Sequence, residues 1–163
     1  MDLDSVAFLF DKSELILLLR LLRCENIPLP WGESEIDAEA ALERLREDHL
    51  ISGSQSALAV DRVIAFLLLA MDSAPFSLYA SGSGYAAIFK TASTSIVLRE
   101  RGGRWLIAPF PAFSDARIFM LDSLRGVQSP CMLTVRSEDG AETRCFQTTK
   151  AAISAAEELL PAE

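Results

Sequence analysis

The stretch YASGSGYAA, residues 79–87, has a glycine spacing that could bind phosphate. A nucleotide-binding loop of this kind follows a strand and opens a helix, whose N-terminus then meets the phosphate. The residues after Gly84, YAAIFKTAST, are rich in β-branched and aromatic types, and no third glycine or P-loop Lys-Ser/Thr pair follows. We therefore expect Gly82 and Gly84 to supply the positive φ angles of a tight reversal between two strands.

Catalysis through the single histidine, His49, is not indicated by its surroundings. As a general base it would need a Cys or Ser nucleophile, and the sequence contains no G-x-S-x-G motif. His49 instead follows an expected helix, where a protonated ring is favourable. We predict no catalytic residue and no enzymatic activity.

Metal and cofactor sites are not indicated either. A cation site needs converging carboxylates, whereas the acidic cluster has the spacing of a solvated helix face beside Arg44 and Arg46. Its members are Glu33, Glu35, Asp37, Glu39, Glu43, Glu47 and Asp48. The three cysteines, an odd number without C-x-x-C spacing, predict neither a disulfide framework nor a zinc site but a reduced, cytoplasmic protein. They are Cys24, Cys131 and Cys145.

Three arginines, Arg99, Arg101 and Arg104, crowd an expected turn at Gly102-Gly103. Guanidinium groups at a hairpin tip can protect the edge of a sheet from pairing with other strands, and this is the favoured interpretation. The functional alternative is that the three arginines bind an acidic partner or a phosphate. They are the candidate partner-binding residues of this sequence.

The composition narrows the choice of partners. Of 163 residues, half are hydrophobic, and the mean hydropathy is +0.25. The net charge of −8 repels phosphate backbones, so we expect no nucleic-acid binding. The apolar runs LILLLRLL and VIAFLLLAM are shorter than a membrane span needs, and the acidic start lacks the positive region of a secretory signal.

Helical periodicity dominates the first part of the chain. A first helix is expected from Ser13, as N-cap, to near Asn26, where prolines follow. A second helix begins at Ser34, with Asp37 completing a box-like cap. The third, from about Ser56 to Met71, is apolar on nearly its whole circumference, so we expect it to be buried on several sides at the centre of the core.

After Pro75 the period changes to two, which predicts antiparallel strands. The expected strands are 76–79, 85–91, 95–101 and 104–110. The turn at Gly102-Gly103 pairs Leu98 with Ile107 and Glu100 with Trp105. One face then carries Ile96, Leu98, Trp105 and Ile107.

Beyond this meander we expect a helix capped by Ser114 and ending at Gly126, with an inward face formed by Ile118, Phe119, Leu121 and Leu124. A hairpin follows, CMLTVRS against TRCFQTT, turning at Asp139-Gly140. It places Cys131 and Cys145 on opposite faces, which excludes a disulfide between them. A last helix runs from about Thr149 to Leu160.

The predicted fold class is α+β: an N-terminal three-helix unit, then an antiparallel β-meander, a helix, a β-hairpin and a C-terminal helix. We expect a single domain over residues 1–163, with a helical subregion at 1–74 and a sheet-centred subregion at 75–163.

The order of these parts resembles the EspG-type proteins, the cytosolic chaperones of ESX (type VII) secretion systems. The segments that carry it are SELILLLRLL, NIPLP, ALERLREDHLISG, SLYASGSGYAAIF and SIVLRERGGRWLI, within residues 8–125. The resemblance implies a cytosolic protein without a reaction of its own, which holds helical secretion substrates against a sheet or groove. It assigns no binding residue.

Two functions therefore remain open. The first is a non-enzymatic protein-interaction role, as a chaperone or accessory factor for type VII secretion substrates, which predicts an exposed apolar or mixed patch on the sheet. The second is a small-molecule or regulatory binding domain, which predicts an enclosed pocket between sheet and helices, near Tyr79, Tyr85 and the three arginines. The sequence leaves a homodimer open.

Overall fold

The computed structural model describes residues 7–31, 35–54 and 56–161. The chain forms two compact units, one from Phe10 to Ser73 and the other from Ala74 onward together with Phe8 and Leu9. Their boundary lies beside Pro75, where the hydrophobic period changes. That residues 1–163 behave as a single domain stays a prediction.

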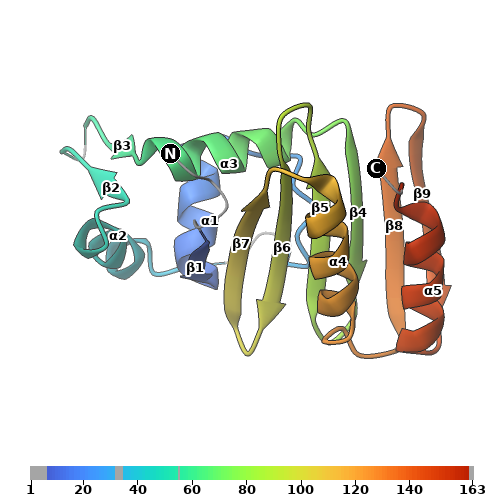
Figure 1. Cartoon of the computed structure of the whole chain (residues 1–163). Helices are drawn as coiled ribbons and strands as arrows, with labels where there is room; N and C mark the ends of the chain where they lie inside the picture. Colours follow the sequence, from blue (N-terminus) through green and yellow to red (C-terminus); the bar gives the residue numbers. More distant parts are fainter. Residues whose placement is uncertain (1–6, 32–34, 55, 162–163) are drawn as a thin grey trace. The chain divides into compact units, whose positions relative to one another are not determined.

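The sheet-centred unit confirms the α+β class and the predicted order of elements (Figure 1). Its elements are β4 (Phe76–Ser81), β5 (Tyr85–Lys90), β6 (Ser95–Arg101), β7 (Arg104–Phe110), α4 (Phe113–Leu124), β8 (Cys131–Ser137), β9 (Gly140–Phe146) and α5 (Thr149–Leu159). The seven strands follow the order β1-β7-β6-β5-β4-β8-β9. The strand β1 (Phe8–Asp11), which lies beside β7, was not predicted.

The register of the first predicted hairpin is confirmed, whereas the turn of the second was predicted one residue too far along the chain. Leu98 lies opposite Ile107 and Glu100 opposite Trp105, on either side of Gly102 and Gly103, which both have positive φ. In the second hairpin Ser137 pairs with Gly140, so the turn is formed by Glu138 and Asp139 rather than by Asp139-Gly140. Cys131 lies opposite Phe146, and the predicted faces of the strands are kept because the register is shifted by an even number of residues. Cys145 is on the other face, and all three cysteines are free.

The loop at Gly82 and Gly84 joins β4 to β5 as predicted, but the predicted reason for its glycines was wrong. Neither glycine is among the described residues with positive φ. A Cβ at Gly82 would lie 2.5 Å from the carbonyl oxygen of Gln128, and a Cβ at Gly84 would lie 2.8 Å from that of Gly126. The two positions need glycine because the chain that connects α4 to β8 passes against them.

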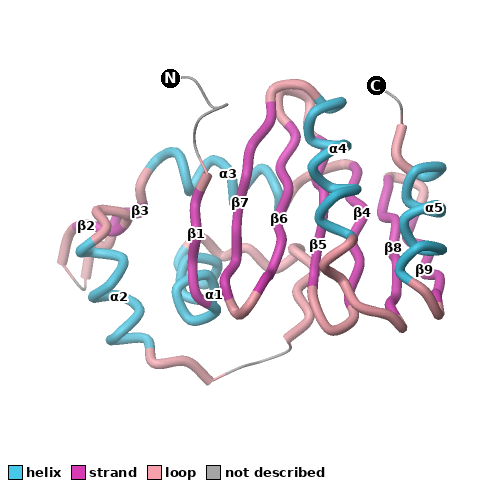
Figure 2. Tube along the Cα trace, turned by 60° about the horizontal axis from the view of Figure 1, so that its bottom comes forward, coloured by secondary structure: helices cyan, strands magenta, loops and turns pink. Residues whose placement is uncertain are grey.

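The helices α4 and α5 lie on the same face of the sheet (Figure 2), here called the helix-covered face. It carries Leu78, Ile88, Val97 and Leu133, which form one core with the buried side chains of the two helices. Those are Ala116, Met120, Leu124, Ala152, Ala156 and Leu160. The predicted inward face of α4 was wrong at Ile118, which is 66% exposed, whereas Ala116, Met120 and Leu124 are buried. The predicted cap Ser114 was also wrong, because the N-cap is Ala112 and Ser114 lies within the helix.

The opposite face of the sheet is also apolar over β5, β6 and β7. The predicted set of Ile96, Leu98, Trp105 and Ile107 is confirmed on this face, and all four are buried. Phe89 and Tyr85 continue the face on β5. Both sides of these strands are therefore packed, which explains why the alternation of polar and apolar residues is weak along them.

In the helical unit, three helices are present with shorter bounds than predicted. They are α1 (Lys12–Leu21), α2 (Ala38–Glu47) and α3 (Arg62–Asp72). The first is capped by Asp11 rather than Ser13, the second by Asp37, and the third by Asp61. The predicted cap Ser34 lies outside the described residues. Residues 51–52 and 59–60 form a small hairpin, β2 (Ile51–Ser52) with β3 (Ala59–Val60). The sequence predicted helix at both places, since β2 lies in the segment expected to be the end of the second helix and β3 in the expected third helix.

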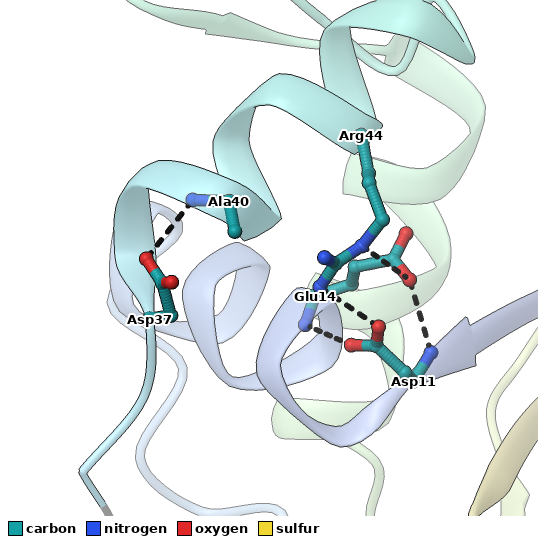
Figure 3. A network of polar contacts seen from close by, with 5 residues as sticks. All are labelled: Asp11, Glu14, Asp37, Ala40 and Arg44. Carbon is teal, nitrogen blue, oxygen red and sulfur yellow. Dashed lines mark hydrogen bonds and ion pairs between the residues drawn. The ribbon is translucent and has the colours of Figure 1, made fainter.

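The start of α1 is held by a capping box and an ion pair (Figure 3). Asp11 Oδ1 accepts from the backbone N–H of Glu14 at 2.8 Å, and Glu14 Oε1 accepts from that of Asp11 at 3.2 Å. The guanidinium of Arg44, on α2, forms ion pairs with both carboxylates: its Nη2 is 2.8 Å from Asp11 Oδ2, and its Nε is 3.7 Å from Glu14 Oε1. This network connects α1 to α2, since it spans both helices.

The helix α3 is less buried than its composition predicted. Ile64, Leu67, Leu68 and Met71 are buried on one side, whereas Phe66 and Leu69 are each 47% exposed. The helix therefore has an ordinary buried face rather than a fully buried circumference, and the expectation of a central core helix was wrong.

Candidate functional site

The three candidate partner-binding arginines all project to the helix-covered face of the sheet. Their alternation along β6 and across the Arg101–Arg104 pair places them on this side. They do not protect an edge, because β6 and β7 each have a neighbouring strand on both sides. The favoured interpretation of these residues was therefore wrong, and their binding to a partner stays a prediction.

Two of these arginines support the position of α4. The Arg99 guanidinium stacks over the ring of Phe119 at 4.7 Å, and a side chain at Gly126 would lie 3.1 Å from Nε of Arg101. Partial burial and the charge of Arg101 lower the pKa of Arg99, while Asp122 opposes the change. Arg101 lies near the carbonyl end of α4, where cations are favoured. Arg104 is exposed and no such contact is described for it.

The tyrosines expected to line a pocket lie on the opposite face of the sheet. The rings of Tyr79 and Tyr85 stack at 6.4 Å, and Tyr85 lies 5.4 Å from Trp105. Burial raises the pKa of the Tyr85 phenol, so its hydroxyl stays protonated. The structure thus separates the tyrosines from the arginines by the thickness of the sheet, and they do not converge on one ligand.

Two open depressions are found elsewhere. One, of about 330 Å³, is lined by Phe110, Pro111, Ala112 and Asp115 at the start of α4. The other, of about 260 Å³, lies along α2 between Glu39, Leu42, Glu43 and Arg46. Neither is lined by the residues that the pocket hypothesis named.

The residues considered for catalysis are His49 and the possible nucleophile Cys24. His49 is exposed just past α2 and has a positive φ of 61°. The Cys24 thiol points to the carbonyl oxygen of Leu68 at 3.8 Å. Burial and the nearby Asp72 raise its pKa to about 11, which disfavours the thiolate that a nucleophile requires.

The acidic side chains of α2 form an exposed face, as predicted. Glu39, Glu43, Glu47 and Asp48 are exposed, and Asp37 acts as the helix cap. Within the described residues, no group of three or more His, Cys, Asp or Glu is arranged to hold a metal ion. In the same part of the chain, no helix is long and apolar enough to cross a bilayer.

The surface that the sequence did not single out lies at the β9 end of the sheet. There Met132 of β8 is 49% exposed on the opposite face, next to Thr143 and Cys145 of β9, which are also exposed. We call these three residues with Ala141 the β8–β9 surface. It is a mixed apolar and polar patch on the sheet, of the kind that the interaction hypothesis predicts.

Comparison with known proteins supports the fold. No protein-family model matches the chain, and no curated protein matches it. Among solved structures it is similar to the Mycobacterium tuberculosis type VII secretion system chaperone EspG5, solved in complex with a PE25–PPE41 dimer. The TM-score is 0.56 at 9% identity, over 75% of this chain and 52% of that chain.

At this identity the similarity is one of fold. The resemblance to EspG-type proteins that the order of elements predicted is therefore confirmed as a structural resemblance. The chain spans about half the length of the EspG5 chain that it matches.

Proposed function

We propose that this protein is a non-enzymatic protein-interaction factor, a chaperone or accessory factor for type VII secretion substrates that acts in the cytosol. The observation that carries the proposal is the EspG5-like fold, since that chaperone was solved with a PE25–PPE41 dimer. A partner of the same class, a helical pair, is the substrate we propose for this chain.

The surroundings of the titratable residues support a binding role. The raised pKa of the Cys24 thiol, about 11, keeps it protonated at neutral pH. The β8–β9 surface offers exposed side chains of mixed character on the sheet. Binding through a surface of this kind needs shape and apolar area rather than reactive groups.

A direct test is co-purification with a PE–PPE pair encoded in the same genome, followed by calorimetry with the purified pair. We expect a stable complex with the native chain. Met132→Arg should weaken it at least tenfold, because it replaces the large exposed apolar side chain of the β8–β9 surface with a charged one. Absence of any complex with such pairs would refute the proposed substrate class.

The arginines are tested in the same assay. Arg99→Glu and Arg101→Glu, singly and together, are compared with Arg125→Glu, whose exposed side chain at the C-cap of α4 gives the same charge change as each single variant without the contacts to Phe119 and Gly126. Circular dichroism controls for folding. Unchanged binding by a folded double variant would remove the arginines from the partner surface.

A further inference from the structure

The strand β9 is an open edge of the sheet. It is last in the strand order, and Gly140 to Cys145 are exposed, with Phe146 partly buried. Its register with β8 runs over seven consecutive pairs without a bulge. Natural edges are usually protected by bulges, prolines or charged side chains; β9 has neither a bulge nor a proline, and its charged side chains are one acidic and one basic residue, Glu142 and Arg144. Its outer backbone groups are therefore suited to pairing with another strand.

The charges of β9 are complementary to themselves. Glu142 and Arg144 lie on the same face, and Nε of Arg144 is 3.1 Å from Oε1 of Glu142. The side chain of Glu142 is 67% exposed and that of Arg144 is 50% exposed. If two copies pair antiparallel about an axis through Thr143, Glu142 of each copy lies opposite Arg144 of the other. An axis through Glu142 or Arg144 would place like charges opposite one another, which is unfavourable.

A fourth register, with the axis through Cys145, places Arg144 opposite Phe146. It brings no opposite charges together. Of these registers, only the one through Thr143 therefore gives two cross-strand pairs of opposite charge, which stabilise the pairing of the strands. The same register places Ala141 opposite Cys145 of the second copy.

We propose that the protein forms a homodimer in which β9 pairs antiparallel with β9 of a second copy, about a two-fold axis through Thr143. The proposal does not depend on the secretion function. A strand-to-strand interface is smaller than a standard one, and two chains of net charge −8 repel each other. The dimer is therefore weak, and its fraction rises with protein concentration.

The first test is a charge exchange on the isolated protein, followed by analytical ultracentrifugation at increasing concentration. Glu142→Arg places Arg opposite Arg, and Arg144→Glu places Glu opposite Glu, so each single variant should lose at least tenfold in dimer affinity. The double variant E142R/R144E restores opposite pairs and should recover the native affinity. The changed side chains are exposed, so the fold is retained.

The second test uses Cys145 to read the register. Ala141→Cys places a thiol opposite Cys145 of the second copy, and mild oxidation should link the two chains. Within one strand these positions are about 14 Å apart, too far for a bond in the same chain. The native protein is the matched control: its two Cys145 residues are also about 14 Å apart across the axis and should stay unlinked.

Each outcome decides the proposal. Loss in both single variants, recovery in the double variant and cross-linking of A141C support it. A native protein that is monomeric at every concentration, or a dimer unaffected by either single variant, overturns it. Cross-linking of the native protein through Cys145 would place the axis at the wrong residue and would also overturn it.

Discussion

The side chain of Asp11 does two things at once: it caps α1 and pairs with Arg44. Asp11→Ala removes both and should lower the free energy of unfolding by about 1 kcal/mol. Asp11→Asn keeps a good capping oxygen and removes the charge, so it should cost only a few tenths of that. Urea denaturation of the two variants measures the difference.

The same residue predicts a pH dependence. Burial by itself would raise the pKa of Asp11, but hydrogen bonds from Glu14 and the charge of Arg44 outweigh it and lower the pKa. The carboxylate therefore stabilises the fold above the unfolded pKa of about 3.9, and this contribution is lost as the pH falls through the lower folded value. The stability difference between native protein and Asp11→Asn should be present at pH 6 and decrease only as the pH falls below about 4, through the lowered pKa of Asp11 in the folded state.

The cysteines should differ in reactivity. Burial raises the pKa of Cys24 to about 11 and also raises that of Cys131, whereas Cys145 is exposed. Since the thiolate is the reacting form, iodoacetamide at neutral pH should modify Cys145 first. Peptide mapping by mass spectrometry checks the order, and labelling of Cys24 ahead of Cys145 would contradict the described environment.

At the scale of elements, the β4–β5 loop depends on the chain before β8. Gly84→Ala would push a Cβ to within 2.8 Å of the carbonyl oxygen of Gly126, which cannot move without the backbone. We expect a loss of about 1–3 kcal/mol. Ser83→Ala in the same loop removes only an exposed hydrogen bond to Gln128 and should cost less than about 1 kcal/mol.

The packing of α4 is tested in the same way. Met120→Ala removes a fully buried side chain from the core between helix and sheet and should cost about 2–5 kcal/mol. Ile118→Ala, on the exposed side of the same helix, should change stability by less than about 0.5 kcal/mol. A large effect at Ile118 would show that the predicted inward face was correct after all. Thermal unfolding of both variants provides the comparison.

At the scale of the whole molecule, the net charge follows directly from the sequence. A net charge of −8 leads us to expect no measurable retention of duplex DNA at about 0.1 M salt, since sequence-independent binding depends on neutralising phosphates. A gel-shift experiment checks this. The proposed homodimer and the proposed secretion partner are tested independently, because dimer formation is measured with the purified protein alone.

Much of the sheet followed from local pattern. The turn at Gly102-Gly103 and the alternation on either side determine which residues of β6 and β7 lie opposite each other, because a two-residue turn leaves a single register that buries the apolar side chains. The separation of Cys131 from Cys145 followed in the same way. The candidate site could not be predicted in this way. The pocket hypothesis grouped Tyr79 with Arg99, but the two side chains lie on opposite faces of the sheet.

What the sequence determined by itself, then, is the fold class, the strands from β4 to β7 and the register of the β6–β7 hairpin, because these depend on neighbours in the chain. The tertiary structure decided that β4 pairs with β8, which leaves β9 at the edge, and that β7 has β1 beside it. It also decided why Gly82 and Gly84 are glycines. These features depend on contacts between distant segments. The hydrophobic periodicity of a strand does not specify which other strand lies beside it in the sheet.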